Sequence, residues 1–596
     1  MTQYRVVDAI ADWFEQLGVQ HYFGFAGGAI WPFMDALIDH PEMEGIQAKH
    51  ESHAVHMADV YFRNTGRLAP VLVSKGPGLL NAVGAVASAM HDTSAVLVIA
   101  GAGSTHVMGK GGMQELYYKG FEDAVSVFRP VTKGSWMVMR PDTVIDVLNY
   151  AYKTAVDGRP GPVFVQVPFD VQLGAVELAN DALELPSTRT VSSRLRGDDA
   201  SIAAVAELVR DAERPVILAG GGTKHSAGAA EALVAVAEQL QVPVATTLTA
   251  KGILSEEHPL SMGVVGRSGT DMAAAATRDA DVVIAVGARF SDNHTSNWRK
   301  GLIYDVSHTK IVHVDVDSQE IGRNFPVAAG IISDAATFFN DLAASTTGAG
   351  GRWSPWLESI ETNRRTWLAK IEPVLHSKSD PIHPGRLCYE IGEALGPDGR
   401  VVIDVGDVIQ YAEPYMTIRR GDAWQINAGM AEMSWATSGI LGAVAADPRR
   451  AAIALTGDGA FNMASQILAT AVEYQLPAIW VILNNHELGI ERKGSDTAYH
   501  RTHAWTRFVR KDTGEPYNPD YVKLAEANGA LGEHIEHADD FAPALGRALA
   551  SGQPYVIDVP IDLTIPTFFT EGVDRAYPAV WASSYPQHSS LRVAQS

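Results

Sequence analysis

Residues 455–460 read Leu455-Thr456-Gly457-Asp458-Gly459-Ala460, a glycine-flanked acid that follows an apolar run. The next apolar run, residues 478–483, leads into Asn484-Asn485. Short apolar runs separated by helical patterns are typical of buried parallel strands. The carboxyl ends of such strands meet at one edge of the sheet, where α/β proteins bind their ligands. The two segments therefore predict a polar site at that edge.

The residue types at this edge suit a metal diphosphate. Mg²⁺ is usually held by a few protein oxygens together with substrate phosphates. We expect its ligands to be Asp458, the Asn485 amide oxygen and a nearby backbone carbonyl, assigned to Glu487. The glycines permit close backbone approach, and a helix that begins after Gly459 presents N–H groups to a phosphate. When only one of the two is present, a Gly-Asp-Gly turn or an Asn-Asn turn is an ordinary structural feature.

The same rhythm of strands and helices runs along the chain and predicts an α/β fold of three doubly wound parallel-sheet domains. A polar segment at 186–193 and a glycine-rich stretch at 345–351 read as joints between them. The expected division is 1–185, 197–345 and 372–565, followed by a C-terminal tail at 566–596.

Composition excludes several classes of partner. The 596 residues carry 47 basic and 69 acidic side chains, a net charge of −22, so a nucleic acid is not expected as the main partner. No apolar stretch approaches the roughly 20 residues of a membrane helix, and acids interrupt the N-terminus before an export signal forms. The single Cys388 has no disulfide partner. A cytoplasmic location is expected.

Taken together, the Gly-Asp-Gly and Asn-Asn segments resemble the cofactor signature of thiamine-diphosphate-dependent enzymes. That family takes an activating carboxylate from its first domain, and residues 49–63 match the pattern around it, which assigns the role to Glu51. The expected Gly-Pro-Gly turn follows at residues 76–78, ending in Gly78, and Asn81 comes shortly after it. The resemblance implies thiamine diphosphate and Mg²⁺ as cofactors, with Glu51 hydrogen-bonded to the aminopyrimidine ring and promoting ylid formation.

The resemblance also implies a set of cofactor-binding residues. Residues 429–434 align with the segment that bends the cofactor, making Met433 the apolar wedge and Ala431 a backbone partner of the aminopyrimidine. Plain core packing is the other interpretation of Met433. The implied cofactor-binding set is Glu51, Gly78, Asn81, Gly406, Ala431, Met433, Gly457, Asp458, Gly459, Ala460, Asn485, Leu488, Gly489 and Ile490.

Within the superfamily, nearly the whole chain is most similar to the acetolactate synthase group. That likeness implies pyrimidine-binding, central Rossmann-like and diphosphate-binding domains, a 2-oxo acid substrate that is decarboxylated and then ligated, and a homodimer or homotetramer with active sites between subunits. In that group Gln114 and Lys133 lie near the substrate. His106, which precedes a glycine-rich run, is a further catalytic candidate.

The chain departs from that group after Asn485. Acetolactate synthases have a tryptophan at the position of Gly494 and an apolar residue at that of Glu491. A glutamate here resembles the decarboxylases, where it handles protons, and sulfoacetaldehyde acetyltransferase, which transfers an acyl group to phosphate. Arg492 and Lys493 are then either contacts for an anionic substrate or a solvated helix surface. Asp407 stands where the group has glutamine; facing a diphosphate it would be repulsive, so we expect it to turn away or to bind a backbone N–H.

Alternatives of other classes stay open. Gly220-Gly221-Gly222 after a strand and Asp315 at the end of another are Rossmann-like features, weak without the full fingerprint, that admit FAD or ADP. Besides carboligation, the residues admit acyl transfer to phosphate, simple 2-oxo acid decarboxylation, flavin-coupled oxidation and a non-catalytic nucleotide-binding relative.

Overall fold

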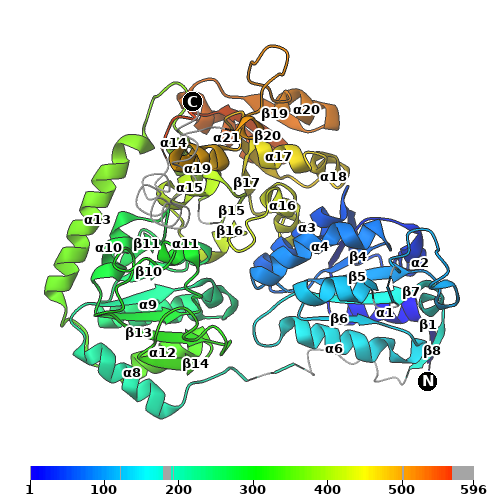
Figure 1. Ribbon diagram of the computed structural model, residues 1–596, viewed down its shortest axis with the longest axis horizontal. Coiled ribbons are helices and arrows are strands. Elements are labelled where there is room, and N and C mark those ends of the chain that lie inside the picture. Colours follow the sequence, from blue (N-terminus) through cyan, green and yellow to red (C-terminus); the bar gives the residue numbers. More distant parts are fainter. Residues whose placement is uncertain are drawn as a thin grey trace, which may run out of the picture.

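The protein folds into three α/β units, each built on a six-stranded parallel sheet with helices on its faces (Figure 1). The predicted fold class is therefore confirmed. The computed structural model describes residues 2–117, 119–120, 123–178, 190–191, 193–396, 398–499 and 503–566. Most of the predicted 186–193 joint and almost all of the predicted 566–596 tail lie outside the described residues.

The first unit has the strand order β3-β2-β4-β5-β7-β6. Its central strands β4 and β5 are buried along their whole length. The strands are β2 (His21–Gly24), β3 (Glu44–Gln47), β4 (Pro70–Val73), β5 (Leu97–Ala102), β6 (Gly134–Met137) and β7 (Val163–Pro168). The helices are α1 (Val6–Gln16), α2 (Trp31–Leu37), α3 (Glu51–Thr65), α4 (Pro77–His91), α5 (Asp123–Phe128), α6 (Val144–Val156) and α7 (Phe169–Gln172).

The third unit repeats this arrangement. Its order, β16-β15-β17-β18-β20-β19, is the order of the first unit when strands are numbered within each sheet. The strands are β15 (Arg400–Ile403), β16 (Trp424–Ile426), β17 (Ala452–Gly457), β18 (Ile479–Asn484), β19 (Leu531–His534) and β20 (Tyr555–Pro560). The helices are α14 (Pro384–Ala394), α15 (Asp407–Tyr415), α16 (Trp435–Ala446), α17 (Asp458–Ala464), α18 (Ile467–Glu473), α19 (Gly489–Tyr499), α20 (Tyr521–Asn528) and α21 (Ala538–Ser551).

The central unit differs, because its order β11-β10-β9-β12-β13-β14 is that of dinucleotide-binding sheets. Its strands are β9 (Pro215–Ala219), β10 (Val244–Thr246), β11 (Ser261–Val264), β12 (Val282–Val286), β13 (Lys310–Asp315) and β14 (Ala329–Ile332). Its helices are α8 (Asp199–Asp211), α9 (Ala229–Leu240), α10 (Asp271–Asp279), α11 (Asp292–Thr295) and α12 (Ala335–Ser345). The long α13 (Ser354–Leu375) then runs along the outside of the molecule toward the third unit (Figure 1).

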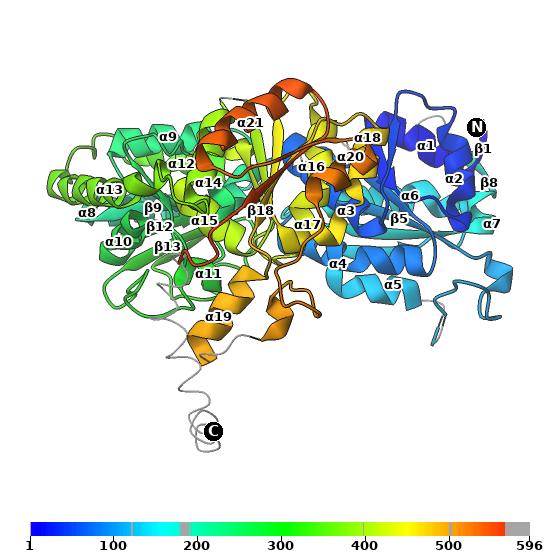
Figure 2. The same ribbon diagram turned by 90° about the horizontal axis from the view of Figure 1, so that it is seen from above.

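The first and third units pack through α3 and α16, which also lie side by side in Figure 2. Two glycines of α16 make this approach possible. A Cβ on Gly439 would lie 2.7 Å from the Val60 side chain, and one on Gly442 would overlap the backbone of Met57. Both helices are buried along almost their whole length, so the contact joins the cores of the two sheets.

β1 (Thr2–Arg5) pairs antiparallel with β8 (Ala175–Leu178), and α1 begins directly after β1 at Val6. The glycine-rich stretch at 345–351 connects α12 to α13. Cys388 is buried and unpaired. Among the described residues, no helix combines the length and apolar character that crossing a membrane requires.

Candidate active site

Three neighbouring strands of the third unit end at one edge. β15 pairs with β17, and β17 pairs with β18, all in parallel. The next helices begin close to these strand ends: α17 directly at Asp458, and α15 at Asp407 and α19 at Gly489 after short connections. Because the N-terminus of a helix carries unpaired N–H groups and partial positive charge, this edge favours an anion.

Asp458 lies at the centre of this edge and is buried. Its Oδ1 accepts the Gly459 N–H at 2.8 Å, and its Oδ2 accepts the His486 N–H at 2.7 Å and the Asn518 amide at 2.8 Å. Burial raises the pKa of Asp458 to about 6, against the lowering effect of these donors. The carboxylate is thus held in one orientation by both strand ends.

Asn518 is a site residue that the sequence did not reveal. Besides Asp458, its Nδ2 lies 2.8 Å from the Asn484 side-chain oxygen and 3.2 Å from Nδ1 of His486. It lies in the non-helical stretch before α20, where no periodic pattern or motif marks it. The one sequence cue near it is Asp520, two residues later, which caps the N-terminus of α20.

The other two predicted metal ligands occupy the end of β18. Asn485 is buried, and its side-chain oxygen accepts the Glu487 N–H at 3.1 Å. Glu487 is also buried, but its carboxylate is held by Arg492, whose Nε lies 2.7 Å away. Burial raises the pKa of Glu487, and Arg492 opposes that shift. Asp458 and Asn485 therefore offer hard oxygens at adjacent strand ends. The ion pair engages the Glu487 side chain and not its backbone carbonyl, the group expected to bind the metal.

The basic residues of α19 do not form a free cationic surface. Arg492 contacts Glu487 and Asp496, and Lys493 is buried with its Nζ 2.8 Å from Asp407. Both sequence interpretations of Lys493, a substrate contact and a solvated surface residue, are therefore replaced by a buried ion pair. Asp407 faces Lys493, a partner that the sequence did not indicate.

The apolar neighbours of the Asp458 edge include the predicted wedge. A Cβ on Gly459 would lie 2.8 Å from Leu488 Cδ2 and 3.3 Å from Met433 Cε, so both side chains pack over this glycine. Ala431 has a positive φ of 52°, and its N–H donates to the Asn427 side chain at 3.1 Å. The segment that carries Met433 is thus fixed beside Gly459, at the start of α17.

Glu51 is the first residue of α3 and is 8% exposed. Its Oε2 accepts the Asn81 amide at 2.9 Å, and its Oε1 lies 3.3 Å from where a Cβ on Gly78 would be. The turn at Gly78 therefore leaves room for the carboxylate. In the part of the chain that is described, no hydrogen bond or ion pair joins Glu51 to Asp458 or Asn485.

A buried polar contact links the Glu51 helix to the wedge segment. His56 of α3 is 1% exposed, with Nδ1 2.7 Å from the Ser438 hydroxyl and Nε2 3.2 Å from the Glu432 carboxylate. Burial would raise the pKa of Glu432, but the contact with His56 lowers it on balance. Glu432 directly precedes Met433, so α3 and the wedge are held together.

Of the remaining catalytic candidates, Glu491 is exposed in the first turn of α19, and the others lie in the first unit. Gln114 is exposed with a φ of 61°, and its carbonyl rests against Gly76. His106 is exposed in a short 3₁₀ turn, Thr105–Val107. Lys133 is turned toward the end of α6, donating to the Asp157 carbonyl at 2.8 Å, and burial lowers its pKa.

The central unit contributes a cleft of about 1020 Å³ against the other two units. Gly221, Gly222 and Arg289 line it, as does Lys224, whose pKa burial lowers to about 7 and whose Nζ donates to the Trp424 carbonyl at 2.9 Å. A Cβ on Gly220 would overlap the Gly287 backbone, so that glycine is required by packing.

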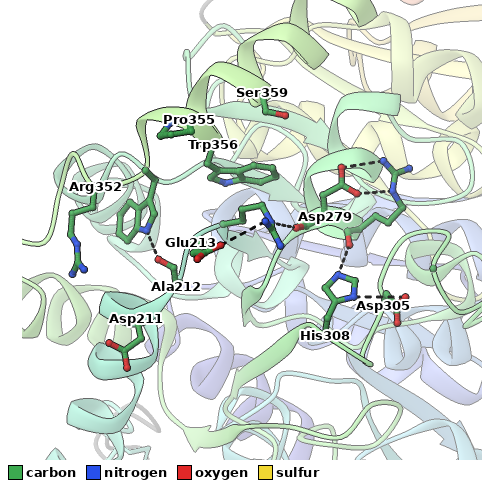
Figure 3. A pocket seen from close by; sticks show the side chains of 14 residues that line it. Asp211, Ala212, Glu213, Asp279, Asp305, His308, Arg352, Pro355, Trp356 and Ser359 are labelled. Atoms are coloured by element: carbon green, nitrogen blue, oxygen red, sulfur yellow. Dashed lines mark hydrogen bonds and ion pairs between the residues drawn. The ribbon is translucent and has the colours of Figure 1, made fainter.

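A second hollow of about 1060 Å³ lies at the opposite, amino-terminal edge of the central sheet (Figure 3). Its polar groups are largely committed to one another. Trp356 donates to the Pro215 carbonyl at 3.2 Å, and His308 lies between Asp305 and the Arg278 carbonyl. This hollow therefore offers no convergent chemical groups comparable to the Asp458 edge.

Comparison with known proteins places all three units in one enzyme family. Residues 4–123 match the N-terminal TPP binding domain of thiamine pyrophosphate enzymes, residues 202–342 the central domain and residues 404–559 the C-terminal TPP binding domain.

Full-length relatives are similar over almost the whole chain. A probable acetolactate synthase large subunit of Methanocaldococcus jannaschii is 34% identical over 93% of this chain and 91% of its own. The acetolactate synthase isozyme 3 large subunit of Escherichia coli is 30% identical over 94% of both chains. The acetolactate synthase large subunit of Corynebacterium glutamicum is 30% identical over 92% of this chain and 86% of its own.

Proposed function

Because the chain belongs to the thiamine pyrophosphate enzyme family, we propose that it uses thiamine diphosphate and Mg²⁺ to decarboxylate a 2-oxo acid and ligate the remaining fragment to an acceptor. The observation that carries this proposal is the meeting of Asp458 and Asn485 at adjacent strand ends, where three helices begin. Hard oxygen donors beside helix N-termini suit a magnesium diphosphate.

The residues present fit the cofactor. Asp458 and Asn485 would hold the metal, and the open space over Gly406, where the nearest atom to an added Cβ is 4.0 Å away, leaves room for the diphosphate. Met433 would support the bend between the two rings. The bound cofactor supplies a carbanion that attacks a carbonyl carbon.

The chain's own residues then control protons. The Glu51 carboxylate, oriented by the Asn81 amide at 2.9 Å, would hydrogen-bond to the aminopyrimidine and favour the tautomer with a basic ring nitrogen. Glu491, exposed in the first turn of α19, would exchange protons with the reacting fragment. Gln114 and His106 are exposed in the first unit, open to substrate.

We infer that two copies of the chain complete each site. Within one chain, the described contacts of Glu51 stay in the first unit and those of Asp458 stay in the third. In a homodimer or homotetramer, Glu51 of one copy would meet Asp458 of the other, and each active site would then contain both residues. We retain the division 1–185, 197–345 and 372–565, and a cytoplasmic location, as parts of the same proposal.

Glu491 and Gly494 favour a second candidate, 2-oxo acid decarboxylation without ligation. Leaving aside its chain neighbours and the backbone of its own helix, no described atom lies within 4 Å of a Cβ added to Gly494, so this position does not wall off an acceptor pocket. A carboxyl group at position 491, carrying a proton, would pass that proton directly to the fragment and become a carboxylate. Transfer to phosphate gains less support, because Arg492 and Lys493 are paired with acids.

The cleft at Gly221 and Gly222 is the proposed site for FAD or ADP. If the purified protein is colourless and releases no flavin on denaturation, FAD is excluded as its cofactor.

A substrate screen tests the proposed function. The purified chain with thiamine diphosphate and Mg²⁺ is offered 2-oxo acids and sulfoacetaldehyde, each with and without phosphate, and products are identified by mass. Carbon dioxide with a ligated hydroxyketone supports carboligation, an aldehyde supports simple decarboxylation, and an acyl phosphate supports the transferase. Absence of turnover with every 2-oxo acid would contradict the proposal.

A further inference from the structure

Lys493 and Asp407 form a buried ion pair beside the proposed diphosphate site. Each residue is 8% exposed, and Lys493 Nζ lies 2.8 Å from Asp407 Oδ2. The Tyr411 hydroxyl oxygen accepts a second hydrogen bond from Lys493 at 2.9 Å and donates to the Ile565 carbonyl at 3.0 Å. Two charges that are buried away from water must compensate each other, so removing either one leaves the other buried without a partner.

The pair connects two of the segments that meet at this edge. Asp407 is the first residue of α15, directly after Gly406, and Lys493 lies one turn into α19. A Cβ on Gly489 would lie 2.3 Å from Asp407 Oδ2 and 2.8 Å from the Asn485 amide nitrogen. Asp407 is therefore packed against the N-terminus of α19, next to a proposed metal ligand.

Asp407 is an acid in a place that should attract anions. Its Oδ1 is buried and has no hydrogen-bond partner among the described residues. An uncompensated carboxylate here would repel a diphosphate, because charge–charge interactions are strong where water is excluded. Lys493 is the cation within hydrogen-bonding distance of it, and its Nζ is held in place by Tyr411.

We propose that Lys493 is a positioning residue of the cofactor site: it neutralises Asp407 and so lets the edge of the third unit accept a diphosphate. This inference rests on the proposed function. It assigns Lys493 to the cofactor's charge balance, acting through Asp407, and not to substrate contact. The pair also ties α15 to α19, so that Gly406 and residues 488–490 face the same space.

The sign of the effect separates charge balance from a merely structural tie. Lys493→Met leaves the Asp407 anion unbalanced and should weaken binding of thiamine diphosphate. Asp407→Asn leaves a cation near the diphosphate and should leave binding unchanged or tighten it. The double variant should restore the affinity. A structural tie would instead predict that both single variants weaken binding and that the double variant does not recover.

The measurement is the dissociation constant for thiamine diphosphate at saturating Mg²⁺, from quenching of tryptophan fluorescence in the full-length apoprotein. We expect a loss of about tenfold or more for Lys493→Met and recovery to within about threefold in the double variant. Lys523→Met removes an exposed lysine that pairs with Asp520 in the same unit, and should bind like the wild type. Thermal melting of each apoprotein reports on folding.

Two results would overturn the proposal. The first is wild-type affinity in Lys493→Met. The second is a loss of about tenfold or more in Asp407→Asn, a result that counts against the proposal even where the lysine variant does not fold. A wild-type chain that fails to bind thiamine diphosphate would overturn the proposed function as well, whereas a binding wild type with an unaffected Lys493→Met contradicts the role of Lys493 alone.

Discussion

The Asn81 amide donates a 2.9 Å hydrogen bond to the Glu51 carboxylate, across the junction between α4 and α3. Glu51 is the first residue of α3, at the end of the helix where the dipole is positive. Gly78 leaves space at the second carboxylate oxygen. One oxygen is thus held by the protein while the other is available to a ligand.

Substituting Glu51 with Gln should abolish most turnover while the cofactor still binds. The amide keeps the shape of the side chain but cannot accept or return a proton, a role that typically contributes 10²- to 10⁴-fold, so we expect a loss of about 100-fold or more. Cofactor affinity, measured by fluorescence, should stay within about threefold, since the amide keeps its contacts. Glu42→Gln, at an exposed position of the same unit, is the control. Full activity in Glu51→Gln would refute the assignment.

Substituting Asp458 with Asn should remove the metal dependence of cofactor binding. Loss of the buried carboxylate takes away a charged metal ligand, so we expect the affinity for thiamine diphosphate with Mg²⁺ to fall by about tenfold or more. Chelation of Mg²⁺ by EDTA should weaken binding in the wild type, and added Mg²⁺ should restore it. Asp199→Asn, at an exposed acid of the central unit, should behave like the wild type. Unchanged affinity in Asp458→Asn would place the metal elsewhere.

The sequence predicts strands best where they are buried on both faces. The apolar runs predicted before Asp458 and at 478–483 fall on β17 and β18, which are buried almost throughout. Edge strands such as β14 and β19 are not predicted in this way, because they are partly exposed and carry no continuous apolar run.

The site shows the same division. Asp458 and Asn485 were predictable as neighbours, because adjacent parallel strands end together. Asn518 and the Asp407–Lys493 pair were not, because each depends on side chains brought together by tertiary packing, over 86 residues in the case of the pair. No periodicity or motif encodes such a contact.

Gly459→Ala tests the packing of Met433 over Gly459, beside the proposed metal ligand Asp458. The added methyl would lie 2.8 Å from Leu488 Cδ2 and 3.3 Å from Met433 Cε. Both are flexible side-chain ends, so we expect the fold to survive and cofactor affinity to fall by about tenfold, or roughly 1.4 kcal/mol. Gly546→Ala, inside α21 with open space around it, should bind normally and gain up to about 1 kcal/mol of stability. Equal affinity in both variants would show that Met433 and Leu488 do not shape the site.

Glu413 should make the stability of the protein fall as pH rises. It is fully buried in α15, neither carboxylate oxygen has a hydrogen-bond partner among the described residues, and burial raises its pKa to about 8. Between its ordinary pKa of about 4.5 and the folded value of about 8, the folded chain keeps a proton that the unfolded chain has lost. The free energy of unfolding therefore decreases through this window and is flat above it.

Glu413→Gln removes this titration, so its melting temperature should gain on that of the wild type as pH rises from 5.5 to 8.5. We expect a relative gain of about 2–6 °C, measured by scanning fluorimetry at one scan rate. Glu393→Gln, at an exposed acid of α14, should follow the wild type at every pH. Parallel curves for Glu413→Gln and the wild type would mean that Glu413 ionises alike in both states, and hence that a water or ion pairs with its carboxylate inside the folded protein.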